Sequence, residues 1–129
     1  MDRKGVFAYC REAFGVLPDY PWEQDDTAVL RHEDNRKWFA IVMKLPKSKL
    51  RPDAEGHSDV MNVKIAPEMV GSFDASEGVY PAYHMNKGHW VSVMLDEAPD
   101  DVVTFLLGVS FELTCKKLNI SKRRKDMDV

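Results

Sequence analysis

Long apolar runs are absent from this sequence of 129 residues. No stretch approaches the ~20 consecutive apolar residues that a membrane-spanning helix needs. Residues 1–6 are followed by the charged side chains of Arg11 and Glu12, and they lack the apolar core and small-residue cleavage site of a secretory signal peptide. These absences predict a cytoplasmic protein that does not associate with a membrane.

Catalytic and cofactor motifs are missing as well. The chain has no G-x-S-x-G, no Walker loop, no Gly-rich dinucleotide pattern and no H-E-x-x-H. No nucleophile accompanies His84 and His89, and the first predicted helix lacks the ridge of carboxylates that hard cations require. The two cysteines, Cys10 and Cys115, have no metal-ligand spacing, and both lie in apolar helical patterns that predict buried free thiols. We therefore expect a non-enzymatic protein with no catalytic residues, no cofactor and no resident metal.

Charge is distributed unevenly along the chain. The net charge is −3, from 18 basic and 21 acidic residues. Residues 36–51 and 116–125 contain no acid and together hold twelve of the basic residues, so the remainder is strongly acidic. Such islands can present a positive patch to a polyanion. They are also typical of a solvated hairpin and of a disordered tail.

The hydrophobic pattern predicts two long helices that flank a series of strands. The first helix is expected over residues 3–14, with an apolar stripe formed by Phe7, Cys10, Phe14 and Leu17. Strands are expected over residues 27–32, 38–45 and 59–65, and a short helix over residues 66–73. The last helix begins at Pro99, and its buried face is expected to comprise Val102, Leu106, Val109 and Leu113.

This order predicts one α+β domain over residues 1–118, with helices packed on one face of a largely antiparallel sheet. Residues 119–129 form a basic, polar tail that we expect to be disordered. At this length one domain is also the ordinary expectation, and we expect a monomer.

Residues 81–90 are the most unusual stretch of the chain. They read PAYHMNKGHW and combine two histidines, a tyrosine, a tryptophan, an asparagine and a lysine beside an apolar strand. We predict a hairpin between residues 83–85 and 90–95, with Gly88 in the left-handed position of its turn. Alternation along the second strand predicts Trp90, Ser92 and Met94 on the outward face and Val91, Val93 and Leu95 in the core.

Four motifs make the chain resemble the YjbR/MmcQ-like family of small proteins. They are DYPWE at residues 19–23, KWFA at 37–40, the segment 81–90 and PDD at 99–101, and the resemblance extends from about Val6 to Lys117. The resemblance implies a frataxin-like (CyaY-like) variant of the α+β fold. It also implies DNA binding through a winged arrangement of strands, which is an analogy of fold.

Nucleic-acid binding is therefore our first hypothesis for function, with DNA or RNA as the partner. Lysine and arginine contact phosphates, and aromatic side chains stack on exposed bases. The overall acidity and the pI of about 5.8 count against this hypothesis. The candidate residues on the two expected hairpins are Lys44, Lys47, Lys49, Arg51, His84, Asn86, Lys87, His89 and Trp90.

The alternative is a module that binds a protein or a small ligand through an aromatic surface patch. Trp22, Trp38, Tyr83 and Trp90 are expected beside one face of the sheet, where aromatic groups rimmed by charge mark an interface. Some of them are instead expected to close the core, Trp38 more than Trp22, because Trp38 lies within an apolar strand. His84 has a similar structural alternative, shared with His89, in which their side chains fix the hairpin turn. A continuous positive face favours nucleic acid, whereas a neutral aromatic groove favours the alternative.

Overall fold

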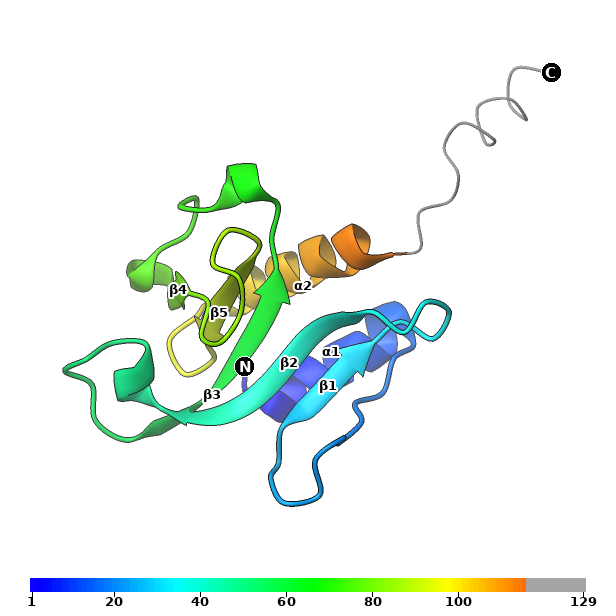
Figure 1. Cartoon of the computed structure of the whole chain (residues 1–129), viewed down its shortest axis with the longest axis horizontal. Helices are drawn as coiled ribbons and strands as arrows, with labels where there is room; N and C mark the ends of the chain where they lie inside the picture. The colour runs from blue at the N-terminus through cyan, green and yellow to red at the C-terminus, as the bar shows by residue number, and fades with distance from the viewer. Residues whose placement is uncertain (116–129) are drawn as a thin grey trace.

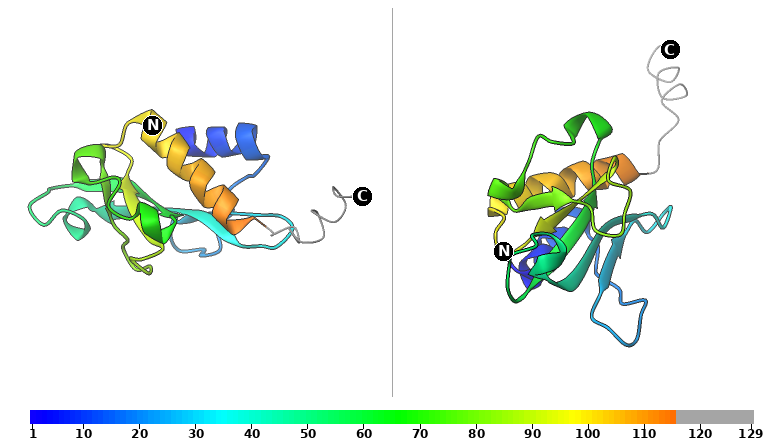
Figure 2. Two further views of the ribbon diagram at one scale, coloured as in Figure 1. Left: turned by 90° about the horizontal axis from the view of Figure 1, so that it is seen from above. Right: turned by 60° about the vertical axis from the view of Figure 1, so that its left-hand side comes forward.

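Two helices cover one face of a five-stranded antiparallel sheet (Figure 1, Figure 2). The computed structural model describes residues 1–115, and the sheet order is β1-β2-β3-β5-β4. The elements are α1 (Arg3–Phe14), β1 (Ala28–Arg31), β2 (Trp38–Pro46), β3 (His57–Lys64), β4 (Val79–Pro81), β5 (Trp90–Met94) and α2 (Asp100–Thr114). Short 3₁₀ turns lie at Lys47–Lys49, Pro67–Met69 and Ala75–Glu77. The predicted α+β class is confirmed, and the expectation of a disordered tail over residues 119–129 falls outside the described part of the chain.

Helix α1 has the bounds that its sequence pattern predicts, because both of its ends are capped. The Asp2 side chain accepts a hydrogen bond from the backbone N–H of Gly5, at 2.9 Å. Gly15 ends the helix at φ 68°, in the left-handed conformation that favours glycine. The chain turns away at this point, so Leu17 does not continue the apolar stripe and is 67% exposed.

The buried face of α2 differs from the expected one. Leu106 and Leu107 are fully buried, but Val109 is half-buried and Leu113 is 38% exposed. Two polar residues face the sheet in their place, because each finds a hydrogen-bond partner there. Ser110 donates to the Phe39 carbonyl and accepts from the backbone N–H of Lys64, and Thr114 is paired with the ring of His32. A reading of apolar periodicity misses such residues.

The core lies between the helices and the sheet. Its strand residues include Leu30, Val42, Met61, Val63, Val91 and Val93. The register between β1 and β2 shifts opposite Phe39, so Phe39 faces the helices while Trp38 lies half-buried on the other face of the sheet. The expectation that Trp38 closes the core is therefore wrong.

The predicted hairpin has the right second strand and the wrong first one. Strand β4 pairs with β5, with Val79 opposite Val93, so residues 82–89 form a loop. The left-handed backbone in this loop is at His84, with φ 58°, and not at Gly88. Ser92 and Met94, expected on the outward face, are also fully buried.

Two smaller expectations also need correction. Only Pro67–Met69 of the short helix predicted over residues 66–73 is helical, because Gly71 turns the chain at φ 92°. Cys10 is buried as expected, whereas Cys115 is only half-buried, and neither forms a disulfide. No helix of residues 1–115 combines the length and the apolar character that crossing a membrane requires.

A candidate ligand-binding groove on the open face of the sheet

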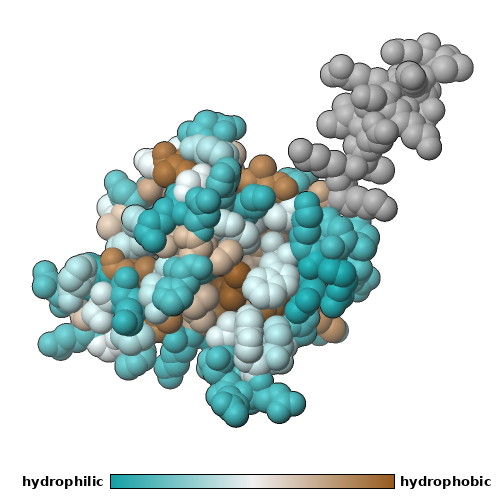
Figure 3. Space-filling model, viewed as in Figure 1, coloured by the Kyte–Doolittle hydropathy of each residue, from teal (hydrophilic) through white to brown (hydrophobic). Residues whose placement is uncertain are grey.

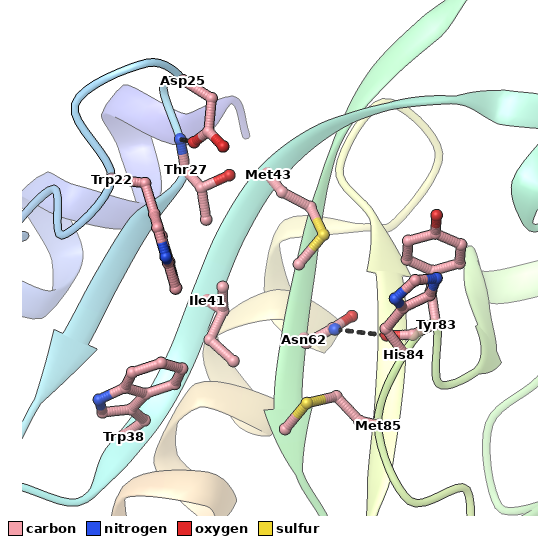
Figure 4. A pocket seen from close by; sticks show the side chains of 10 residues that line it. All are labelled: Trp22, Asp25, Thr27, Trp38, Ile41, Met43, Asn62, Tyr83, His84 and Met85. Atoms are coloured by element: carbon pink, nitrogen blue, oxygen red, sulfur yellow. Dashed lines mark hydrogen bonds between the residues drawn. The ribbon is translucent and has the colours of Figure 1, made fainter.

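A groove of about 410 Å³ lies over β2 and β3, on the face of the sheet that the helices leave open (Figure 4). One side is the Trp22 loop, residues 18–27, and the other is the β4–β5 loop, residues 82–89. Figure 3 shows apolar residues near the middle of this face and hydrophilic residues around them. The lining residues are Trp22, Asp25, Thr27, Trp38, Ile41, Met43, Asn62, Tyr83, His84 and Met85.

The two tryptophans form one corner of the groove. Their ring centroids lie 5.9 Å apart, and their planes meet at 90°. The shift in register opposite Phe39 turns Trp38 to this face, and Trp22 reaches it from the loop, where it stays 44% exposed. The loop is held in place by a pair of backbone hydrogen bonds between Asp19 and Val29, at 2.8 and 2.9 Å. An exposed loop residue is thus fixed beside a rigid strand.

A closed network of buried polar groups supports the opposite side. The Ser92 hydroxyl donates to Asn62 Oδ1 at 2.5 Å and accepts from the backbone N–H of Tyr83 at 2.8 Å. Asn62 Nδ2 donates to the Tyr83 carbonyl at 3.0 Å (Figure 4). Every member of this network has a partner, which fixes Tyr83, and with it the loop, against the sheet. In the sequence, this network is indicated only by Asn62, a polar residue in the middle of an apolar strand.

His84 has a strained backbone. Its φ of 58° is uncommon for a residue other than glycine and costs on the order of 1 kcal/mol. The imidazole lies against the ring of Tyr83, with centroids 4.0 Å apart, and it lines the groove. Strain of this kind persists only where the surrounding structure imposes it, and it is concentrated at ligand-binding sites. Among the residues that line the groove, only His84 has a positive φ.

Comparison with known proteins places the chain in a family. The YjbR family model matches residues 11–113. The chain belongs to the YjbR family. It is 37% identical over 116 residues to the uncharacterized protein YyaQ of Bacillus subtilis (strain 168), covering 88% of this chain and 98% of that protein.

Solved structures agree with this assignment. A crystal structure of a Pseudomonas syringae protein is 40% identical, with a TM-score of 0.83 over 89% of this chain and all of that one. A solution NMR structure from the same organism gives 39% identity and a TM-score of 0.80, over 91% of this chain and 95% of that one. A Deinococcus radiodurans protein, 23% identical with a TM-score of 0.66 over 96% and 86% of the two chains, shares the fold.

The basic residues of the β2–β3 connection, residues 47–56, lie outside the groove of this YjbR-family chain. Lys47 forms an ion pair with Asp96 at 3.4 Å, and Arg51 forms one with Glu97 at 2.7 Å. The Lys44 and Lys49 side chains are exposed. Of the four predicted contacts, Lys44 lies in β2 and three lie in the connection, and two of those three, Lys47 and Arg51, are partly neutralised by acidic residues of the same chain.

The second set of predicted site residues is also dispersed. His84 reaches the groove, whereas Lys87 and His89 are exposed outside its lining. Asn86 accepts a hydrogen bond from the Gly88 backbone N–H at 2.8 Å, so it is Asn86 that fixes the turn, and no side-chain bond from either histidine occurs within residues 1–115. Trp90 is half-buried opposite Lys64 in the sheet and does not line the groove.

The described residues contain neither a group of metal ligands nor a cysteine with a lowered pKa. Among residues 1–115, no three His, Cys, Asp or Glu side chains gather in a way that could hold a metal ion. Burial raises the pKa of the Cys10 thiol to about 12, so this thiol is protonated at neutral pH. The pKa of Cys115 is also raised, first by desolvation and then by the nearby carboxylates of Glu112 and Asp34. Neither cysteine has the depressed pKa of a nucleophile.

Proposed function

We propose that this YjbR-family chain is a non-enzymatic binding protein and that the groove on its open sheet face takes a small ligand. The carrying observation is that two loops, distant in sequence, place aromatic side chains around one groove. Its volume of about 410 Å³ lies in the range of small-molecule sites, which are mostly apolar with a few placed polar groups. Thr27 and Asp25 are such polar groups here.

The charges around the groove support a small ligand over a polyanion. Its lining contains a carboxylate and no lysine or arginine. Lys47 and Arg51 are occupied by acidic partners on the same chain. The features that favour a ligand therefore coincide in space, whereas the exposed basic residues do not join them.

The test is a screen of small aromatic and aliphatic compounds by two-dimensional NMR of the full chain. We expect amide shifts to concentrate at residues 22–27, 38–43 and 83–85 and to be lost in Trp22→Ala. The control is Phe105→Ala, which removes an aromatic side chain that is 51% exposed on α2. Shifts that avoid the groove, or that persist equally in Trp22→Ala, would refute the proposal.

DNA binding is the second candidate function. It is favoured by Lys44, Lys49 and Lys87, which are exposed and have no ion-pair partner within residues 1–115.

We also infer a frataxin-like variant of the fold, because helices at the two ends of the element order cover one face of an antiparallel sheet. Superposition on a frataxin, with all strands and both helices in matching order, tests that inference.

The DNA hypothesis is tested by fluorescence anisotropy over a range of salt concentrations. Lys44→Glu combined with Lys49→Glu is expected to weaken binding to every sequence and to reduce the slope of log affinity against log salt. The matched control is Lys4→Glu with Arg11→Glu, which changes two exposed charges on α1. Equal losses in the two double variants would mean that net charge, and not the positions of Lys44 and Lys49, governs binding.

A further inference from the structure

The groove has the features of a cation site. Resting on the proposed function, we propose that its ligand is a small molecule with an alkylammonium head, a quaternary or methylated amine. The head lies in the corner between Trp22 and Trp38, with the carboxylate of Asp25 at one end of the groove (Figure 4).

The geometry of the indoles supports this chemistry. A cation is attracted to the face of an aromatic ring, most strongly to tryptophan, at up to about 6 Å from the ring centroid. Two indoles at 90° with centroids 5.9 Å apart offer a corner that contacts such a head from two sides. A cationic group already lies at one of these rings: the guanidinium carbon of Arg31 is 5.7 Å from the Trp38 centroid, within the distance at which such attraction operates.

The charge around the corner has the matching sign. Residues 18–27 contain four acidic residues and no basic one. Two of these four are used internally: Asp19 pairs with Arg31 at 2.9 Å, and Asp26 lies 3.7 Å from Arg3. Asp25 lines the groove and accepts one backbone hydrogen bond from Thr27, at 2.8 Å, through Oδ1. Its second oxygen has no hydrogen-bond partner among the described residues and is free to attract a cation.

The rest of the lining suits methyl groups. Ile41, Met43 and Met85 contribute apolar surface, and thioether sulfurs are polarizable and adapt to irregular shapes. A bare ammonium ion in the corner would lose most of its water, and apart from Asp25 and Thr27 the side chains around it offer few hydrogen bonds in return. A methylated ammonium has little hydration to lose. The groove therefore favours the alkylated cation over lysine-like amines.

The experiment compares choline with 3,3-dimethylbutan-1-ol, an uncharged molecule of the same shape. Tryptophan fluorescence and NMR shifts are followed on the full chain. We expect saturable choline binding with a Kd in the millimolar range, about tenfold tighter than the alcohol. Asp25→Asn should weaken choline several-fold and leave the alcohol unchanged, and Trp22→Ala should weaken both. The controls are Glu23→Gln and Tyr20→Ala, which change the same loop outside the groove lining.

The outcomes separate this inference from the proposed function. If the alcohol binds as tightly as choline and both depend on Trp22, the cationic head is wrong and the groove remains a ligand site. If choline does not saturate while uncharged compounds shift groove residues, the inference is likewise overturned. If the choline affinity is unchanged in both Asp25→Asn and Trp22→Ala, the placement of the head between Trp22 and Trp38 is refuted. The proposed function itself is refuted if no compound shifts groove residues, or if the shifts avoid the groove or persist equally in Trp22→Ala.

Discussion

At the scale of single residues, the candidate site combines one residue with an unfavourable backbone conformation and a set of buried polar side chains that all have hydrogen-bond partners. His84 takes a left-handed conformation although glycine is available four residues later at Gly88. The loop accepts this strain because Asn62 and Ser92 hold the neighbouring Tyr83 backbone in place. The strained residue and its support therefore lie on the same side of the groove.

The strain at His84 can be measured by a paired substitution. His84→Gly and His84→Ala both remove the imidazole, so they differ only in backbone preference. We expect the glycine variant to be more stable by about 1 kcal/mol, because glycine adopts a positive φ without steric cost. Urea unfolding gives both values. The same pair at His89, whose φ is not positive, should show the opposite order, and an unchanged order there would contradict this explanation.

The buried thiol of Cys10 predicts a pH dependence of stability. Its pKa is raised by burial from the ordinary value of 9.0 to about 12. The stabilisation from its protonated form is therefore fully present below pH 9 and is lost as the pH rises from there toward 12, because only the unfolded chain releases the proton. We expect the free energy of unfolding to fall less between pH 8 and pH 10 in Cys10→Ala than in the parent chain. Cys115→Ala, which removes a thiol that is only half-buried, should reduce this fall less than Cys10→Ala does. An equal effect of the two substitutions would contradict the assignment to Cys10.

At the scale of elements, the bounds of the two long helices were predicted better than the hairpin. Local signals specify a helix, so Asp2 and Gly15 gave α1 its bounds. The first strand of the hairpin is set by pairing with β5 across the sheet. The polar and aromatic residues of 81–90 led to a predicted strand at 83–85, which lies in the loop.

The sequence indicated Trp22, Trp38 and Tyr83 beside one face of the sheet, and His84 as a site residue. It could not show that they share one groove, because the register shift that turns Trp38 to this face and the partners of Asn62 are set by tertiary contacts.

Ion pairing between elements leads to a prediction at Glu97. Its carboxylate accepts from the Tyr80 hydroxyl at 2.6 Å and pairs with Arg51. The pKa of Tyr80 is raised, first by burial and then by the hydrogen bond to Glu97. Glu97→Gln should lower the pKa of Tyr80 in an NMR titration and cost less than about 1 kcal/mol of stability, because Arg51 is about half exposed.

The neighbouring substitution Asp96→Asn is the control for that measurement. It removes one carboxylate from the same segment and one ion pair, that with Lys47. It does not touch the Tyr80 hydroxyl, so the pKa of Tyr80 should stay where it is in the parent chain. A similar decrease in both variants would mean that general charge, and not the hydrogen bond, controls Tyr80.

At the scale of the whole molecule, the proposed function rests on the open face of the sheet. Antiparallel sheets can leave one face to solvent. Here two loops partly cover that face, and an aromatic groove remains between them. The basic island of residues 36–51 lies partly in ion pairs, and the island of residues 116–125 lies outside the described residues. Within the first of these islands, Lys47 and Arg51 are paired with acidic residues of the same chain, whereas Lys44 and Lys49 are exposed.

Ending the chain after Leu118 tests the contribution of residues 119–129. The core residues of α2, the last of which is Thr114, are all retained, so we expect the thermal midpoint to stay nearly unchanged. Any DNA affinity should fall, and its salt slope should shrink by up to about 0.9 for each basic residue lost among residues 122–125 that contacts a phosphate. Choline binding should stay the same, because the groove lies within residues 22–85. A lower thermal midpoint would mean that the domain extends past Leu118, and an unchanged salt slope would assign any DNA contact to residues 1–118.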